Sequence, residues 1–153
     1  MGDPDRISRN DWETILHAPF QVYRAVASVD EKPTEAQFRR LSEEIVGGRG
    51  HFSDGTIGLT MTETLSANLD PFWAAFQGSG RSTKDGLKKV KGALKKAPDD
   101  ESVALRDWLV GLAVRIAEAD RQVGFGAVTE NEARAIRDVA GWLDRPAPDV
   151  PQS

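Results

Sequence analysis

The chain has 153 residues, of which 39% are apolar and 29% charged, and its formal net charge is -4. This length suits one domain with a substantial core, and the acidic balance argues against nucleic-acid binding by the whole surface. The absence of cysteine excludes disulfides, thiolate zinc sites and thiol nucleophiles, and it fits a cytosolic location. We expect neither a signal peptide nor a membrane span, because no suitable apolar stretch is present.

Composition along the chain predicts three parts. We expect a loose N-terminal tail over residues 1–8 and a single helical domain over residues 9–144. Residues 145–153 contain three prolines, which oppose a helix, so we expect a disordered tail there. No alternating run of β-branched residues predicts a strand, and the expected fold class is all-α.

Helix start signals recur through the chain. A cap followed three residues later by Glu or Gln occurs at Asn10/Glu13, Thr34/Gln37, Thr60/Glu63 and Thr129/Glu132. Asp70 before Pro71 predicts a further start. Pro19 predicts a kink in the first helix, or its break into two pieces near Ala18.

Apolar residues at helical spacing predict a compact bundle of six or seven helices. The main stripes are Ile15, Leu16, Val22, Tyr23 and Val26; Phe38, Leu41 and Ile45; Leu105, Trp108, Leu109, Leu112 and Ile116; and Ala133, Ile136, Ala140 and Leu143. Shorter helices are expected at about 58–68 and 70–77, and a lysine-rich one at about 83–97. Phe72 and Phe76 should share a face and enter the core, whereas Trp73 should point elsewhere, into the core or toward a partner.

Two segments of the chain are similar. In each, an amphipathic helix ends at an aspartate, Asp30 or Asp120, and a turn leads to a Thr-Glu pair that starts a second amphipathic helix. We interpret them as two related helical hairpins, neither of which can bury its apolar face alone. Chance similarity is the alternative, because Thr-Glu caps are common.

The stretches AVASVDEKPTEAQFRRL and RIAEADRQVGFGAVTENEARAIRDVAGWL resemble the tellurite-resistance TerB-like family. The resemblance implies a compact α-helical bundle with acidic residues at its hairpin turns. It also implies a role in metal-ion handling, stress response or membrane-associated complexes. The chain departs from the family pattern because Glu31 and Arg121 stand where a glycine usually follows each turn aspartate.

The candidate metal ligands are Asp30, Glu31 and Asp120, which would bind a divalent ion if the two turns met. No D-x-D-x-D-G calcium loop is present. The alternative is that these carboxylates only hold turns through hydrogen bonds to the backbone. No other cofactor is expected.

The remaining motifs favour structural roles. His17 and His51 form no metal-ligand or catalytic motif, and the glycines between Gly47 and Gly58 are interpreted as a flexible connector. Neither a nucleophile elbow nor a distinguished carboxylate pair supports an enzyme.

The lysine-rich segment 83–97 is the strongest charge feature, with six lysines, one aspartate and a net charge of +5. Its candidate surface for an anionic partner consists of Lys84, Lys88, Lys91 and Lys95. The alternative, which we favour, is an ordinary solvated face of a core helix.

The leading hypothesis is a non-enzymatic cytosolic binding or scaffold protein of TerB-like type, acting in stress or metal-ion response with another protein as its partner. One alternative is a peripheral binder of anionic membranes or nucleic acid through residues 83–97. A second is an enzyme whose site is assembled from scattered Asp and Glu residues.

Overall fold

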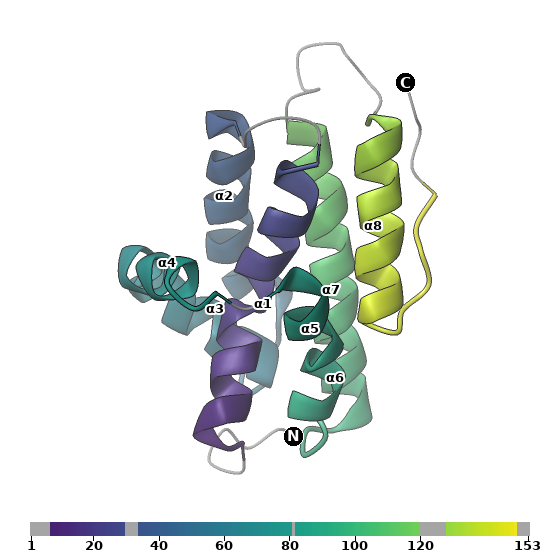
Figure 1. Ribbon diagram of the computed structural model, residues 1–153. Helices are drawn as coiled ribbons and strands as arrows, with labels where there is room; N and C mark the ends of the chain where they lie inside the picture. Colours follow the sequence, from purple (N-terminus) through teal and green to yellow (C-terminus); the bar gives the residue numbers. More distant parts are fainter. Residues whose placement is uncertain (1–6, 30–33, 81, 120–127, 150–153) are drawn as a thin grey trace.

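The computed structural model describes residues 7–29, 34–80, 82–119 and 128–149. Its helices are α1 (Arg9–Ala27), α2 (Glu35–His51), α3 (Ile57–Ala67), α4 (Leu69–Gln77), α5 (Thr83–Lys88), α6 (Val90–Ala93), α7 (Asp99–Glu118) and α8 (Glu130–Trp142) (Figure 1). Lys89, between α5 and α6, keeps a helical backbone with φ -81° and ψ -12°, so these two segments form one interrupted helix. Counted that way, the described residues form seven helices, which confirms the predicted all-α bundle.

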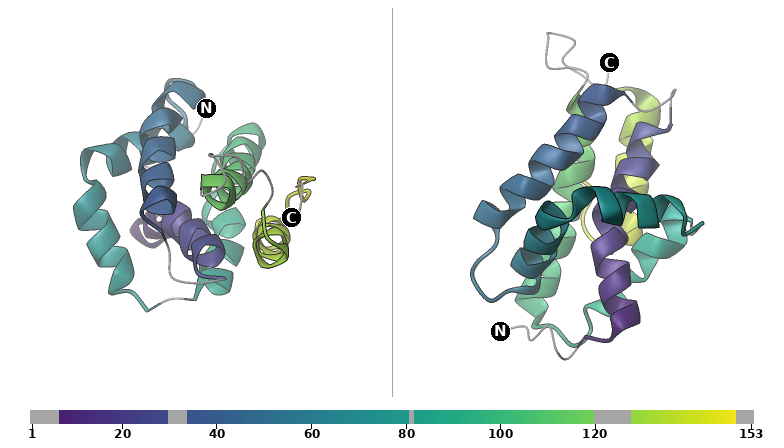
Figure 2. Two further views of the ribbon diagram at one scale, coloured as in Figure 1. Left: turned by 90° about the horizontal axis from the view of Figure 1, so that it is seen from above. Right: turned by 90° about the vertical axis from the view of Figure 1, so that its left-hand side faces the viewer.

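The N-terminal helix α1 is the centre of the bundle and contacts every other helix. Figure 2 shows α3 and α4 on one side of α1 and α8 on the other, with α7 and α8 side by side. Ile15, Val22 and Val26 share one side of α1 and Phe20 lies on another, and all four are fully or almost fully buried. A helix that is apolar on several faces is one that neighbours cover on several sides.

The two predicted hairpins correspond to α1 with α2 and α7 with α8, and the helices of each pair contact one another. Thr34 Oγ1 accepts from the Gln37 N–H at 3.1 Å, while Gln37 Oε1 accepts from the Thr34 N–H at 3.2 Å. Thr129 and Glu132 make the same reciprocal pair at 3.1 and 2.9 Å. Both capping boxes are therefore confirmed. The turn aspartates Asp30 and Asp120 lie outside the described residues.

Two other helices begin earlier than the sequence predicts. The cap of α1 is Ser8, not Asn10, and its Oγ accepts from the Asp11 N–H at 3.1 Å. The cap of α3 is Thr56, and Thr60 lies inside the helix. Tertiary packing explains the extra turn of α3, because Ile57 is 1% exposed and donates its N–H to Glu101 Oε1 at 2.8 Å.

The start of α4 also differs from the prediction. The helix begins at Leu69, so Asp70 lies in its first turn, and Asn68 occupies the cap position without a side-chain hydrogen bond to the first turn of α4. α4 follows α3 directly, and Asn68 serves as the C-terminal boundary of one helix and the N-terminal boundary of the next.

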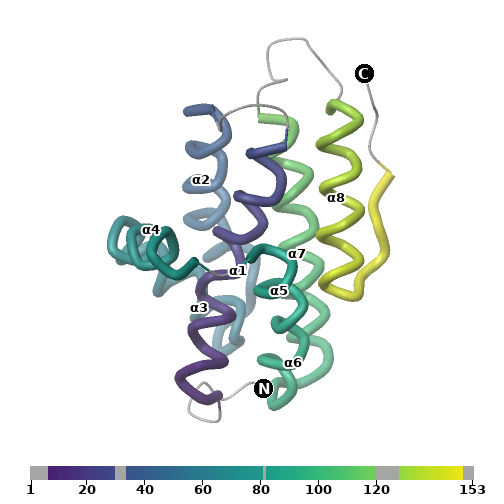
Figure 3. The backbone as a smooth tube through the Cα atoms, viewed as in Figure 1, coloured from purple at the N-terminus to yellow at the C-terminus, as the bar shows by residue number. Residues whose placement is uncertain are grey.

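Pro19 does not break the first helix, contrary to one of the two sequence expectations. α1 runs without interruption from Arg9 to Ala27, and its axis changes direction about half-way along (Figure 3). Proline lacks an N–H and leaves one helical carbonyl without its usual donor, which accounts for a bend without a break.

Aromatic side chains join α4 to the centre of the bundle. The Trp73 ring centroid lies 5.2 Å from that of Phe38 and 5.8 Å from that of Phe76. Phe76 is fully buried, as expected, whereas Phe72 is half-buried and packs against the edge of the core. Trp73 is partly buried and packs against the same core, which confirms the core alternative for this residue. It can do so because α4 lies against α1.

The ordered chain extends slightly beyond the range 9–144 expected for the helical domain. Ile7 is buried, and Ser8 caps α1. At the other end, the Arg145 guanidinium binds the Asp107 carboxylate with contacts of 2.6 and 3.3 Å. None of the helices formed by the described residues combines the length and apolar character that a bilayer crossing requires.

Candidate functional site

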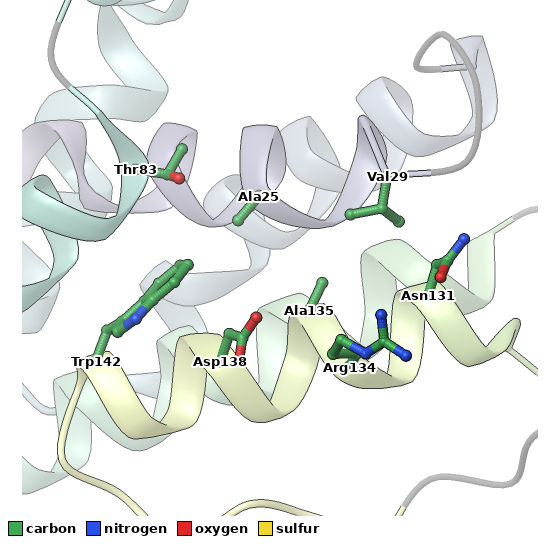
Figure 4. A pocket seen from close by; sticks show the side chains of 8 residues that line it. All are labelled: Ala25, Val29, Thr83, Asn131, Arg134, Ala135, Asp138 and Trp142. Atoms are coloured by element: carbon green, nitrogen blue, oxygen red, sulfur yellow. The ribbon is translucent and has the colours of Figure 1, made fainter.

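A groove of about 360 Å³ lies between α1 and α8, with the start of α5 at one end (Figure 4). We call it the α1–α8 groove. Its lining residues are Ala25, Val29, Thr83, Asn131, Arg134, Ala135, Asp138 and Trp142. The groove therefore lies where the first and last hairpins meet.

Helical spacing explains why α8 contributes most of this lining. Five of the residues lie on one side of the helix, because each is three or four positions from another of the set: Asn131, Arg134, Ala135, Asp138 and Trp142. The predicted core stripe of Ala133, Ile136, Ala140 and Leu143 is buried on the adjoining side. One short helix thus closes the core with one stripe and lines the groove with the other.

The lining combines apolar and charged groups. Ala25 and Ala135 are small and mostly covered, so they form an apolar floor, and the half-buried Trp142 indole projects into the groove. Arg134 and Asp138 are exposed one turn apart on the rim. The floor of the groove can bind an apolar group of a partner. The positive and negative charges on the rim can then pair with charged groups beside that apolar group.

The rim arginine is only weakly restrained. Arg134 Nη2 lies 3.7 Å from Glu130 Oε1, and the two side chains are 62% and 77% exposed. An exposed ion pair of this kind contributes about 0–1 kcal/mol, so a bound group of opposite charge can replace it.

Val29 adds an exposed apolar edge to the groove. It is 36% exposed, and among the described residues only Val46 is a comparably exposed large hydrophobic, at 46%. Val29 lies two residues after the end of α1 and precedes Asp30 in the chain.

The lysine surface is separate from the groove lining and exposed to solvent. Lys84, Lys88, Lys91 and Lys95 are all exposed, while the predicted apolar stripe Leu87, Val90 and Leu94 is buried against the core. This is the arrangement expected of a solvated face. The helix predicted over residues 83–97 is interrupted at Lys89 and ends at Ala93, and Gly86 and Gly92 weaken it because glycine disfavours helix interiors.

Lys91 Nζ lies 2.6 Å from the Asp144 carboxylate. This hydrogen bond, together with the lysine's charge, lowers the pKa of Asp144 below its usual value. Lys91 is therefore engaged with the end of α8, which makes it a weaker candidate for an anionic partner than the other three lysines.

The candidate metal ligands Asp30, Glu31 and Asp120 lie outside the described residues, so the metal site stays a prediction. Within residues 7–29, 34–80, 82–119 and 128–149, no group of three or more His, Cys, Asp or Glu side chains is placed to hold a metal ion.

The two histidines occupy different environments. His17 is 6% exposed, and its ring stands edge-on to Phe76 with centroids 5.5 Å apart, as expected of a structural residue. His51 is exposed at the end of α2 and lines a second hollow of about 440 Å³ between α2 and α7. Glu44 and Arg115 form an ion pair in this hollow.

The glycines before residue 51 belong to α2 and not to a connector, which corrects that interpretation. Gly48 lies where α3 crosses α2, and a Cβ atom there would stand 2.5 Å from Thr62 Cγ2. Only glycine permits this close approach, so tertiary packing overrides its poor helix propensity. The connector between α2 and α3 is limited to residues 52–56.

Comparison with known proteins gives no assignment: no family model matches the chain, and neither a curated protein nor a solved structure matches it. The resemblance to the TerB-like family thus rests on the sequence motifs alone.

Proposed function

We propose that this protein is a non-enzymatic binding or scaffold protein whose partner surface is the α1–α8 groove. The observation that carries the proposal is the lining of the groove, in which a small apolar floor and a tryptophan lie beside an arginine and an aspartate. Tryptophan and arginine are among the residues most enriched at the energetically dominant positions of protein interfaces.

The size of the groove favours side chains of a protein partner. A hollow of about 360 Å³ holds a few side chains and not a whole helix. We infer that one apolar side chain of the partner lies against Ala25, Ala135 and Trp142. Flanking charges of the partner would pair with Arg134 and Asp138, which gives specificity more than affinity.

The resemblance to the TerB-like family supplies the cellular part of the proposal, namely a role in stress or metal-ion response in the cytoplasm. A divalent ion at Asp30, Glu31 and Asp120 would belong to the same proposal. Asp30 directly follows Val29 of the groove in the chain.

The proposal is tested by selecting peptides from a random display library on the wild-type protein. Selected peptides should compete for one site and carry an acidic residue that pairs with Arg134. Arg134→Glu should weaken them about tenfold or more, since it replaces an attraction by a repulsion. Arg137→Glu is the matched control, because Arg137 is exposed on the same helix and does not line the groove.

Equal weakening by Arg134→Glu and Arg137→Glu would show a nonspecific charge effect and contradict the proposed surface. Failure to enrich any peptide that depends on the groove would contradict the proposed function as a whole.

A further inference from the structure

Two glutamine side chains are buried among the described residues, Gln21 in α1 and Gln37 in α2. Gln37 takes part in the capping box of α2, whereas Gln21 has no such role. Gln21 is 1% exposed, and within the described residues neither its amide nitrogen nor its amide oxygen has a hydrogen-bond partner. An amide that is buried without partners is unfavourable, because it has lost its hydrogen bonds to water. Each such group in a folded protein calls for a specific explanation, and a ligand that it binds is one.

Gln21 lies on the side of α1 that lines the groove, although it is not itself a lining residue. Gln21, Ala25 and Val29 are spaced four residues apart, which places them along one side of α1, and the last two line the groove. Gln21 is therefore one helical turn beyond Ala25, in the direction away from Val29.

The neighbouring helix α5 lies against the Gln21 side chain. A Cβ atom on Gly86 would stand 2.3 Å from Gln21 Nε2, so the amide reaches across to α5 at Gly86. Gly86 follows Thr83 by one turn, and Thr83 lines the end of the groove. The amide thus lies between α1 and α5, one turn beyond Ala25 and Thr83, and is buried next to the groove without lining it.

The chemistry of this amide defines what it can receive. It offers two N–H donors and one carbonyl acceptor and carries no charge. A carboxylate would satisfy only the donors and an ammonium only the acceptor, and either would bury a charge beside apolar side chains. A carboxamide presents a donor and an acceptor side by side, so it can make both hydrogen bonds at once.

We propose that the α1–α8 groove binds a partner segment through an Asn or Gln side chain whose carboxamide pairs with the amide of Gln21. This inference rests on the proposed function and names the chemistry of the partner. In the structure the amide faces Gly86, so this pairing requires the Gln21 side chain to rotate toward Ala25.

The test uses two probes of nearly the same shape, isobutyramide and isopropyl methyl ketone, which differ only in the NH₂ or CH₃ group on the carbonyl carbon. Each is titrated into nitrogen-labelled full-length protein and followed in proton–nitrogen correlation spectra. The side-chain NH₂ signals of Gln21 are identified by their loss in Gln21→Met.

Isobutyramide should shift the Gln21 NH₂ signals and the Trp142 indole N–H saturably, and the ketone should bind about tenfold more weakly, because it lacks the donor. Gln21→Met should bind the two probes equally. Unchanged Gln21 signals, or equal affinities of the two probes for the wild type, would overturn the inference. Gln21→Glu is a second variant, which removes both donors to the probe's carbonyl but keeps an acceptor for the N–H of the amide, so it should weaken both probes and retain the preference for the amide.

The peptide selection separates this inference from the proposed function. Groove-dependent peptides without Asn or Gln would overturn the carboxamide inference and leave the function standing. Saturable isobutyramide binding without any groove-dependent peptide would support the site and overturn the protein partner.

Discussion

Replacing Gln21 by methionine should stabilise the fold. The two side chains are similar in length and volume, so the methionine would fill the same space against Gly86 without an unpaired amide. A buried polar group without a partner costs about 1–3 kcal/mol, and removing it should raise the free energy of unfolding by about that amount. For a chain of about 150 residues, each 1 kcal/mol shifts the melting temperature by about 2–4 °C.

Gln37→Met is the matched control, because Gln37 is also buried, at 3% exposure, but its Oε1 accepts from the Thr34 N–H at 3.2 Å. Loss of that hydrogen bond should lower the free energy of unfolding by about 1 kcal/mol. Urea unfolding of the wild type and both variants gives the comparison. If Gln21→Met is destabilised as much as Gln37→Met, the Gln21 amide has partners, and the reasoning is refuted.

Three further predictions concern the caps and the charged surface. Thr129→Ala should lower the free energy of unfolding by about 1 kcal/mol through loss of a helix cap, and an unchanged urea midpoint would rule the cap out. Wild-type protein should show no measurable association with anionic vesicles or nucleic acid at ordinary salt; salt-sensitive binding that is lost when glutamine replaces Lys84, Lys88, Lys91 and Lys95 would promote the electrostatic alternative. Lys91→Gln should raise the pKa of Asp144 toward its usual value in an NMR titration, because Lys91 is the main cause of the lowering. The sign follows from the lowered pKa: the Lys91–Asp144 contact supports the fold above the unfolded pKa of Asp144 and is lost as the pH falls through the folded one. An unshifted titration curve would show that the contact does not form in solution.

The sequence predicted the parts of the fold that depend on local pattern. The apolar stripes and the capping boxes at Thr34 and Thr129 depend on residues within a few positions of one another, and all were confirmed. The starts of α1 and α3 were missed because contacts distant in sequence set them, as when Glu101 binds the N–H of Ile57. Gly48 was assigned to a connector for the same reason, since its contact with Thr62 decides its place in α2.

The groove was not predictable from the sequence, because its lining has no pattern of its own. Arg134 and Asp138 look like ordinary exposed residues, and Ala135 and Trp142 do not fall on the predicted core stripe. Only the packing of α8 against α1 brings them beside Ala25. One signal was present in the sequence. Asn131, Ala135, Asp138 and Trp142 are spaced three or four residues apart, which indicates a second face of α8 beside the core stripe.

The most direct test of the central claim is the affinity of a selected peptide for Ala25→Leu, with Ala75→Leu as its control. Leucine at Ala25 fills the floor of the groove, whereas Ala75 is exposed on α4, on the opposite side of α1 from α8. We expect Ala25→Leu to weaken the peptide at least about tenfold, as overfilling a packed contact usually does, and Ala75→Leu to leave its affinity unchanged. Equal affinities for both variants would contradict the claim that the groove is the binding surface.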